Sequence, residues 1–145
     1  MKALLISACL LGSRCKYTGG SNALPDVVLD KLRRRYRLVP ACPETAGGLP
    51  VPREPAERRG AQVISRGGAD VTAAYEKGAV LTLALARREG CRLALLKERS
   101  PSCGHGRVYD GSFTSTLVPG NGTAAEKLLD EGITVYGETE IAALL

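Results

Sequence analysis

Residues 93–104 read LALLKERSPSCG, an apolar run that is typical of a buried strand and then a loop that carries a thiol. The same order occurs twice earlier in the chain. Ala3–Ala8 leads into Cys9, and Leu38–Ala41 leads into Cys42. In open α/β sheets, ligands bind outside the carboxyl ends of the strands. The cysteines Cys9, Cys42 and Cys103 are therefore predicted to meet at one edge of a sheet.

Glycine, proline and capping signals divide the rest of the chain into alternating strands and helices. The predicted strands are residues 3–8, 37–41, 92–97 and 133–136, and the predicted helices are residues 25–35, 73–89, 123–131 and 139–145. Residues 42–70 are expected to be irregular apart from a short extended piece at 62–65. The alternation predicts an α/β fold: a three-layer, Rossmann-like, mainly parallel sheet of about four strands with flanking helices and a small hairpin.

Three local patterns give finer expectations. Asp110-Gly111, with β-prone residues on both sides, predicts a tight hairpin turn. Residues 79–86 are apolar nearly all round, which predicts that this helix is deeply packed against the sheet. Thr123–Glu126 has the spacing of a capping box at the start of a helix.

Length and composition indicate one domain, residues 1–145, in a reducing compartment. A chain of 145 residues buries a core without disulfides, and five sparsely spaced cysteines favour metal-binding or catalytic thiols. A cytoplasmic location is therefore predicted. The six apolar residues before Cys9 are too few for a secretory signal, and no stretch is long enough for a membrane helix. The net charge of +5 suits a small anionic ligand and falls short of a nucleic-acid footprint, and the pattern predicts no oligomeric state.

Three thiols at one edge favour a metal or cluster site, with cysteines that only fill the core as the alternative. A structural zinc site would take Cys15 or His105 as a fourth ligand. An iron-sulfur cluster of four irons and four sulfides (4Fe-4S) with one open iron would need only the three thiolates. A thiol or persulfide carrier with one reactive cysteine is a further candidate. Cys15 is predicted to line the same pocket, whereas Cys91, between a helix end and a strand start, is predicted to be structural.

Five motifs together carry a family resemblance. They are SACLLG at 7–12, CKYTG at 15–19, CPE with GGL at 42–49, DVT at 70–72, and SPSCG with YDG at 100–111. In their order and spacing, over nearly the whole chain, they resemble the thiouracil desulfurase family. Thr18 is a departure, because the family more often has an acidic residue before the glycine.

The resemblance implies a non-redox desulfurase that converts thiolated uracil, as base, nucleoside or nucleotide, to uracil and hydrogen sulfide. It implies a 4Fe-4S cluster held by Cys9, Cys42 and Cys103, whose remaining iron takes the sulfur of the substrate. It also implies catalytic roles for Glu44 and Ser100.

The positions of Glu44 and Ser100 in the sequence support such chemistry independently of the resemblance. Glu44, two positions after a predicted ligand, is placed to activate water as a general base, and Ser100 to hydrogen-bond the tetrahedral centre or relay a proton. The plainer interpretations are that Glu44 pairs with an arginine and that Ser100 starts a turn with its neighbouring proline. Arg14, Arg53 and Lys97 are candidate anion contacts if the substrate is a nucleotide.

Overall fold

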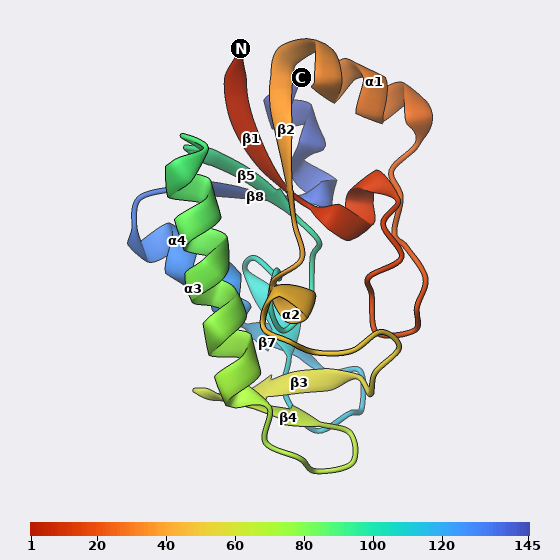
Figure 1. The fold of residues 1–145 in the computed structure, drawn as a ribbon. Coiled ribbons are helices and arrows are strands. Elements are labelled where there is room, and N and C mark those ends of the chain that lie inside the picture. Colours follow the sequence, from red (N-terminus) through yellow and green to blue (C-terminus); the bar gives the residue numbers. More distant parts are fainter.

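A parallel sheet of four strands lies at the centre of the computed structural model, which describes residues 1–145 (Figure 1). The strands are β1 (Lys2–Ser7), β2 (Tyr36–Ala41), β5 (Leu93–Leu96) and β8 (Thr134–Gly137), in the order β2-β1-β5-β8. Five of the six residues of β1 are buried, as expected for a strand that is covered on both faces. The predicted α/β class and the number of strands are confirmed.

Helices cover both faces of the sheet, so the molecule has three layers (Figure 1). One face carries α3 (Thr72–Arg88) and α4 (Thr123–Asp130), which pack on a cluster of 14 buried residues. The other face carries α1 (Asp26–Arg35) and the 3-10 helices η1 (Ala8–Leu11) and η2 (Glu138–Leu144). Four residues of this 14-residue cluster lie side by side in one row across the sheet: Val39, Leu5, Ala94 and Val135.

The chain reverses its direction across the sheet between β1 and β5. From β1 it crosses through α1 to β2, and from β2 it crosses through α3, on the opposite face, to β5. Right-handed crossovers to either side of β1 require helices on opposite faces. Such a reversal opens a crevice beyond the carboxyl ends of the two central strands, where α/β proteins bind ligands.

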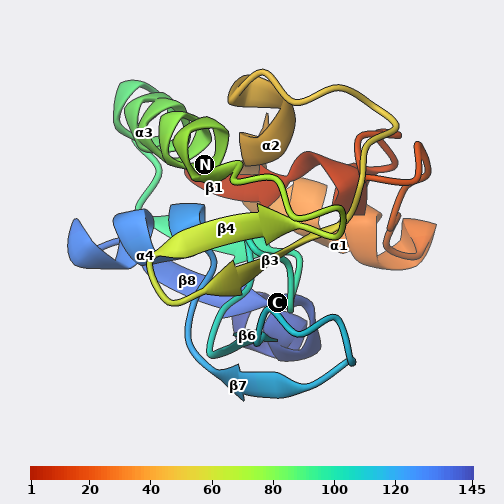
Figure 2. The ribbon, with the colours of Figure 1, turned by 90° about the horizontal axis from the view of Figure 1, so that it is seen from below.

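Two hairpins and a short helix lie at this carboxyl edge, at the end of the molecule opposite the termini (Figures 1 and 2). They are α2 (Pro43–Ala46), the antiparallel pair β3 (Ala56–Arg59) and β4 (Gln62–Ser65), and the antiparallel pair β6 (Arg107–Tyr109) and β7 (Leu117–Pro119). Residues 42–70 are thus more regular than predicted. The short charged strand β3 lacks the alternation of apolar residues that marks a strand, but it pairs with the apolar β4.

The predicted tight turn at Asp110-Gly111 is wrong. The loop between β6 and β7 runs from Asp110 to Thr116, because Asp110 Oδ1 accepts bonds from the backbone N–H and the hydroxyl of Ser112. The chain then continues through Phe113 and Ser115, at φ +58° and +59°, before the strands pair. An Asp side chain that bonds two residues ahead starts a local turn of its own and leaves the hairpin loop open.

Two expectations for the helices are also wrong. Thr123 makes no capping bond, because the first N–H groups of α4 donate to carbonyls of the loop that follows β5, and Glu126 instead pairs with Arg58. Val80 and Leu81 of α3 are 52% and 45% exposed, so this helix buries one face only.

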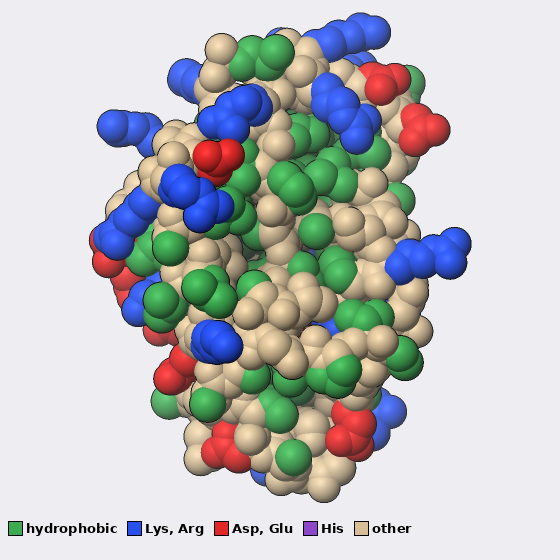
Figure 3. Space-filling view, in the orientation of Figure 1, with side chains coloured by type: hydrophobic (Ala, Val, Ile, Leu, Met, Phe, Trp, Pro, Cys, Tyr) green, Lys and Arg blue, Asp and Glu red, His purple; other side chains and the backbone are tan.

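In Figure 3, Lys and Arg side chains are spread around one face of the molecule, with hydrophobic side chains scattered between them. No helix combines the length and the apolar character needed to cross a membrane.

Candidate functional site

A cavity of about 440 Å³ opens at the carboxyl edge of the sheet. Loops that follow β1, β2 and β5 line it, together with parts of both hairpins. Most of the predicted site residues lie on its wall: Cys9, Cys15, Cys42, Glu44, Arg53, Lys97, Ser100 and Cys103. Arg14 does not, because it lies in the turn after η1 and its side chain is exposed to solvent.

The first two thiols stand directly at strand ends. Cys9 is buried in η1, which follows β1 without a break and ends at Gly12 in a left-handed conformation (φ +102°). Cys42 follows β2 and immediately precedes α2. Its thiol donates to the backbone carbonyl oxygen of Cys15 at 4.0 Å. The Cys15 thiol also interacts with the Cys42 side chain, so the two thiols lie side by side on the cavity wall.

The loop that carries Cys103 is held from within and from α4. Ser100 Oγ accepts the backbone N–H of Cys103 at 2.7 Å and that of Ser102 at 3.2 Å. Backbone N–H groups at the start of α4 donate to the carbonyls of Pro101 and Ser102 at 2.9–3.1 Å. These contacts leave no room for a side chain at Gly122, whose added Cβ would lie 2.4 Å from the carbonyl carbon of Ser102.

Glu44 is positioned by direct backbone packing of α2 on α3. A Cβ at Gly78 would lie 1.9 Å from the carbonyl oxygen of Pro43, and a Cβ at Gly47 would lie 2.0 Å from that of Ala74. Both positions must therefore be glycine for the two helices to approach so closely. Because Cys42 and Glu44 flank Pro43, this one contact fixes a thiol and a carboxylate together.

The Glu44 carboxylate accepts four hydrogen bonds, and they are divided unequally between its oxygens. Oε1 accepts from Arg53 Nε at 3.1 Å, Arg53 Nη2 at 2.9 Å and the Tyr75 hydroxyl at 2.9 Å. Oε2 accepts only from Ser102 Oγ, at 2.7 Å. Since each carboxylate oxygen has about two acceptor sites, Oε1 is fully used and Oε2 keeps one site free.

The side chains of Arg53 and Lys97 are already engaged inside the protein. The side chain of Arg53 is 7% exposed. Besides its bonds to Glu44, it donates to the carbonyl oxygens of Pro50 and Cys15 at 3.0 and 2.9 Å. Lys97 pairs with Glu138 on η2. The contacts of Arg53 tie the loop before α1 to α2, so its evident role in the structure is to orient Glu44.

Burial raises the pKa values of three thiols of the cavity, those of Cys9, Cys15 and Cys103. It raises the pKa of Cys103 to about 12, against hydrogen bonds involving Ser7 and Ser102 that lower it. Burial and the neighbouring Cys42 raise the pKa of Cys15 to about 12. Burial likewise raises the pKa of Cys9, and it raises the pKa of Tyr75 with a further contribution from the adjacent Glu44 carboxylate.

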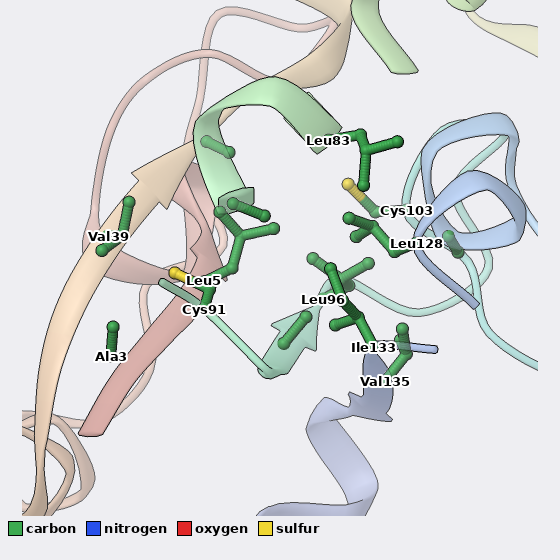
Figure 4. Close-up of a cluster of buried hydrophobic side chains, with 14 residues drawn as sticks. Ala3, Leu5, Val39, Leu83, Cys91, Leu96, Cys103, Leu128, Ile133 and Val135 are labelled. Carbon is green, nitrogen blue, oxygen red and sulfur yellow. The ribbon is translucent and has the colours of Figure 1, made fainter. Parts of the chain in front are cut away.

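Cys91 lies apart from the cavity. It is 5% exposed, precedes β5 at the amino end of the strand, and packs in the same hydrophobic cluster as Cys103. Figure 4 shows the two sulfur atoms at separate points of that cluster, with Cys91 near Leu5 and Cys103 near Leu83 and Leu128. The sequence interpretation of Cys91 as a structural residue agrees with this placement.

Several lining residues were not singled out from the sequence: Lys16, Arg66, Tyr75, Arg99, Ser102 and Phe113. Ser102 lies within the quoted SPSCG motif, and its position between Ser100 and Cys103 was the available signal. Lys16, Arg66 and Arg99 make no ion pair, and no local pattern distinguishes them from other surface cations.

The donor set fits a cluster better than a single ion. No group of three or more His, Cys, Asp or Glu side chains is arranged around one point, as a closed zinc site requires. Cys9, Cys42 and Cys103 instead surround a cavity from three separate strand ends. Thiolates are the standard ligands of iron-sulfur clusters, which are larger than one ion and take ligands around a volume.

A three-layer α/β protein with cysteine thiols and a partly buried carboxylate around the crevice at its carboxyl edge belongs to the class of enzymes that build their site at strand ends. This chain belongs to the 2-thiouracil desulfurase family, which it matches over residues 4–140. It is 38% identical to the uncharacterized protein YbbK of Bacillus subtilis (strain 168), over 98% of this chain and 99% of that protein. Its structure is similar to that of the 4Fe-4S-dependent thiouracil desulfidase TudS, with a TM-score of 0.94 and 44% identity over 99% of this chain and 95% of TudS.

Proposed function

We propose that this protein is a 4Fe-4S-dependent thiouracil desulfidase, which converts thiolated uracil to uracil and hydrogen sulfide. The observation that carries the proposal is the juxtaposition in one cavity of Cys9, Cys42 and Cys103 with a partly buried carboxylate, Glu44. Membership of the 2-thiouracil desulfurase family and the likeness to TudS support it.

Cys9, Cys42 and Cys103 would hold the cluster. When bound, it supplies an iron without a protein ligand, a Lewis acid with affinity for sulfur that makes a thiocarbonyl carbon more electrophilic. Ligation requires the thiols to lose their protons, and burial raises the pKa values of Cys9 and Cys103. Cys15 also lines the cavity; its thiol lies beside Cys42 and is left without a cluster iron by this assignment.

Glu44 acts as the general base, and the atom that takes the proton of the attacking water is Oε2. Oε1 has no acceptor site left, whereas Oε2 accepts one bond and has room for another. Arg53 and Tyr75 hold the carboxylate in place from the other side. General-base catalysis of this kind contributes about 10²–10⁴-fold to the rate.

Ser100 stands next to this base through Ser102. Ser102 Oγ can donate to Glu44 Oε2 at 2.7 Å or to the Cys103 sulfur at 3.7 Å, and the shorter contact takes its one hydrogen. Ser100 is then the donor in the contact of 3.2 Å between the two hydroxyls. Because Ser100 Oγ already accepts two backbone N–H groups, its hydrogen is what it offers to other partners. When the substrate is bound, Ser100 would turn this single hydrogen from Ser102 Oγ to the oxygen or sulfur of the tetrahedral centre, or pass it on as a proton.

The reaction balances without an electron donor or acceptor. Water adds its oxygen to the thiocarbonyl carbon, the carbon–sulfur bond breaks, and both hydrogens of the water leave with the sulfur as hydrogen sulfide. The substrate is a thiolated uracil as base, nucleoside or nucleotide. Lys16, Arg66 and Arg99, the unpaired cations of the cavity wall, would meet the phosphate of a nucleotide. The free thiols suit the reducing cytoplasm as its location.

The two alternatives receive less support from the geometry. A structural zinc site needs four ligands around one point, and the thiols are not arranged so. A persulfide carrier needs an activated thiolate, whereas burial raises the pKa values of Cys9, Cys15 and Cys103.

Anaerobic reconstitution tests the proposal directly. The protein should bind about four irons and four sulfides per chain, and it should release sulfide from a thiouracil while uracil accumulates. Stoichiometric zinc without iron, or a loaded protein that leaves thiouracil, its nucleoside and its nucleotide unchanged, would contradict it.

A further inference from the structure

Phe113, the only phenylalanine of the chain, lines the cavity from the loop between β6 and β7. Other aromatic side chains line the cavity with it. The chain has five Tyr, one Phe and no Trp, and four of these six side chains line this cavity: Tyr17, Tyr75, Tyr109 and Phe113. Tyr75 is committed to Glu44 through its hydroxyl. Aromatic faces gathered in one cavity suit a flat, partly apolar ligand.

The backbone of Phe113 is held in a conformation that a bulky residue rarely adopts, with φ at +58°. Glu57, on β3, fixes it there. One oxygen of Glu57, Oε1, accepts the backbone N–H of Phe113 at 3.1 Å and that of Gly111 at 3.0 Å. Unfavourable conformations persist where the surroundings impose them, and they are frequent at ligand clamps. The anchoring by a neighbouring hairpin thus presents this ring at a fixed place on the cavity wall.

A cation accompanies the ring. The guanidinium carbon of Arg66 lies over Phe113, 5.7 Å from the ring centroid, and Arg66 lines the same cavity. The Arg66 side chain makes no ion pair, and it contacts the Phe113 ring instead. A guanidinium over an aromatic face is favourable and holds the ring in one orientation. A flat ligand would then use the remaining surface of the ring.

We propose that Phe113 is the stacking surface for the pyrimidine ring of the substrate, an inference that rests on the function proposed above. Stacking fixes the plane of the ring from the hairpin side of the cavity. The thiols and Glu44, on the side of the sheet, then act on the thiocarbonyl group. Base stacking on one aromatic side chain is worth roughly 5- to 150-fold in affinity.

Binding of uracil to the cluster-loaded protein tests the inference, because the product binds without reacting. Anaerobic calorimetry should give a dissociation constant roughly 5- to 150-fold higher for Phe113→Gly than for the wild type. Glycine adopts positive φ freely, so the loop can keep its path while the ring is lost. Phe113→Tyr keeps the ring and should bind uracil within about threefold of the wild type. Leu117→Ala, on the same hairpin but outside the cavity wall, is the control and should bind normally.

The inference is overturned if Phe113→Gly binds uracil as tightly as the wild type, or if Leu117→Ala weakens binding as much. Its failure is distinct from that of the proposed function. A wild type that releases sulfide from thiouracil while Phe113→Gly binds uracil normally would refute the stacking surface alone. A loaded wild type that binds uracil through Phe113 but releases no sulfide would refute the desulfidase alone.

Discussion

Replacement of Glu44 by Gln separates the proton transfer from the construction of the site. Gln keeps the shape of the side chain and one acceptor oxygen for Arg53 and Tyr75, but it removes the charge and the basic Oε2. Sulfide release should fall by roughly 100-fold or more, the scale for loss of a general acid-base group. The Michaelis constant should change little, because the base acts on water.

The same change has a structural cost that can be worked out from the contacts. Arg53 is 7% exposed, so Glu44→Gln leaves a buried guanidinium without its counter-charge, although its bonds to two backbone carbonyls remain. The free energy of unfolding should fall by about 1–3 kcal/mol. For a domain of this size that lowers the melting temperature by about 2–10 °C. The variant should still fold and bind iron at room temperature.

Three measurements on the Glu44→Gln variant and the wild type test this prediction: iron and sulfide per chain, the visible spectrum, and sulfide released per cluster. Glu126→Gln is the matched control, since Glu126 also pairs with an arginine, Arg58, but lies outside the cavity. The reasoning is refuted if Glu44→Gln turns over normally, which would place the base elsewhere. It is also refuted if this variant loses its iron while the control retains it, because Glu44 would then be a ligand or a purely structural residue.

Three further predictions concern the thiols. Cys42→Ser should abolish or cripple the cluster whereas Cys15→Ser should keep it, as iron analysis will show; the reverse result would reassign the ligands. Cys91→Ala should retain iron and activity and lose about 1–2 kcal/mol of stability from the core, and a folded variant without iron would contradict its structural role. Cluster-free protein should lose stability in alkali. Burial raises the pKa of Cys103 from 9.0 to about 12, so its contribution is complete below pH 9 and is lost as the pH rises to about 12. Denaturation curves at pH 8 and 10 should show this loss, and Cys103→Ala should reduce it; an unchanged slope in that variant would contradict the assignment.

The strands and the placement of the thiols could be predicted from sequence because both are local signals. Unbroken apolar runs that end at Gly, Pro or Cys mark strands covered on both faces, and parallel strands bring their carboxyl ends to one edge. That is why Cys9, Cys42 and Cys103 line one cavity. The failures have a common physical cause. Thr123 has the local pattern of a cap, but carbonyls of the distant Cys103 loop satisfy the helix instead.

The hydrogen-bond donors to Glu44 could not be predicted from local sequence patterns, for the same physical reason. Its donors come from positions 9, 31 and 58 residues away in the chain: Arg53, Tyr75 and Ser102. Local sequence patterns offer pairing with an arginine and general-base catalysis as alternatives, yet the geometry allows both at once. Oε1 takes the arginine, and Oε2 stays available.

The packing of α2 on α3 explains how one short segment could serve both of the functions proposed for it. Pro43 lies between Cys42 and Glu44, and its carbonyl oxygen is the atom that Gly78 approaches. Any side chain at Gly78 would push α2 away from α3, because a Cβ there would lie 1.9 Å from that oxygen. Such a shift would move the thiol and the carboxylate by the same displacement. The two roles proposed for this segment, holding a cluster and activating water, therefore depend on the same backbone contact, and Gly47 and Gly78 contribute to the proposed site although neither has a side chain.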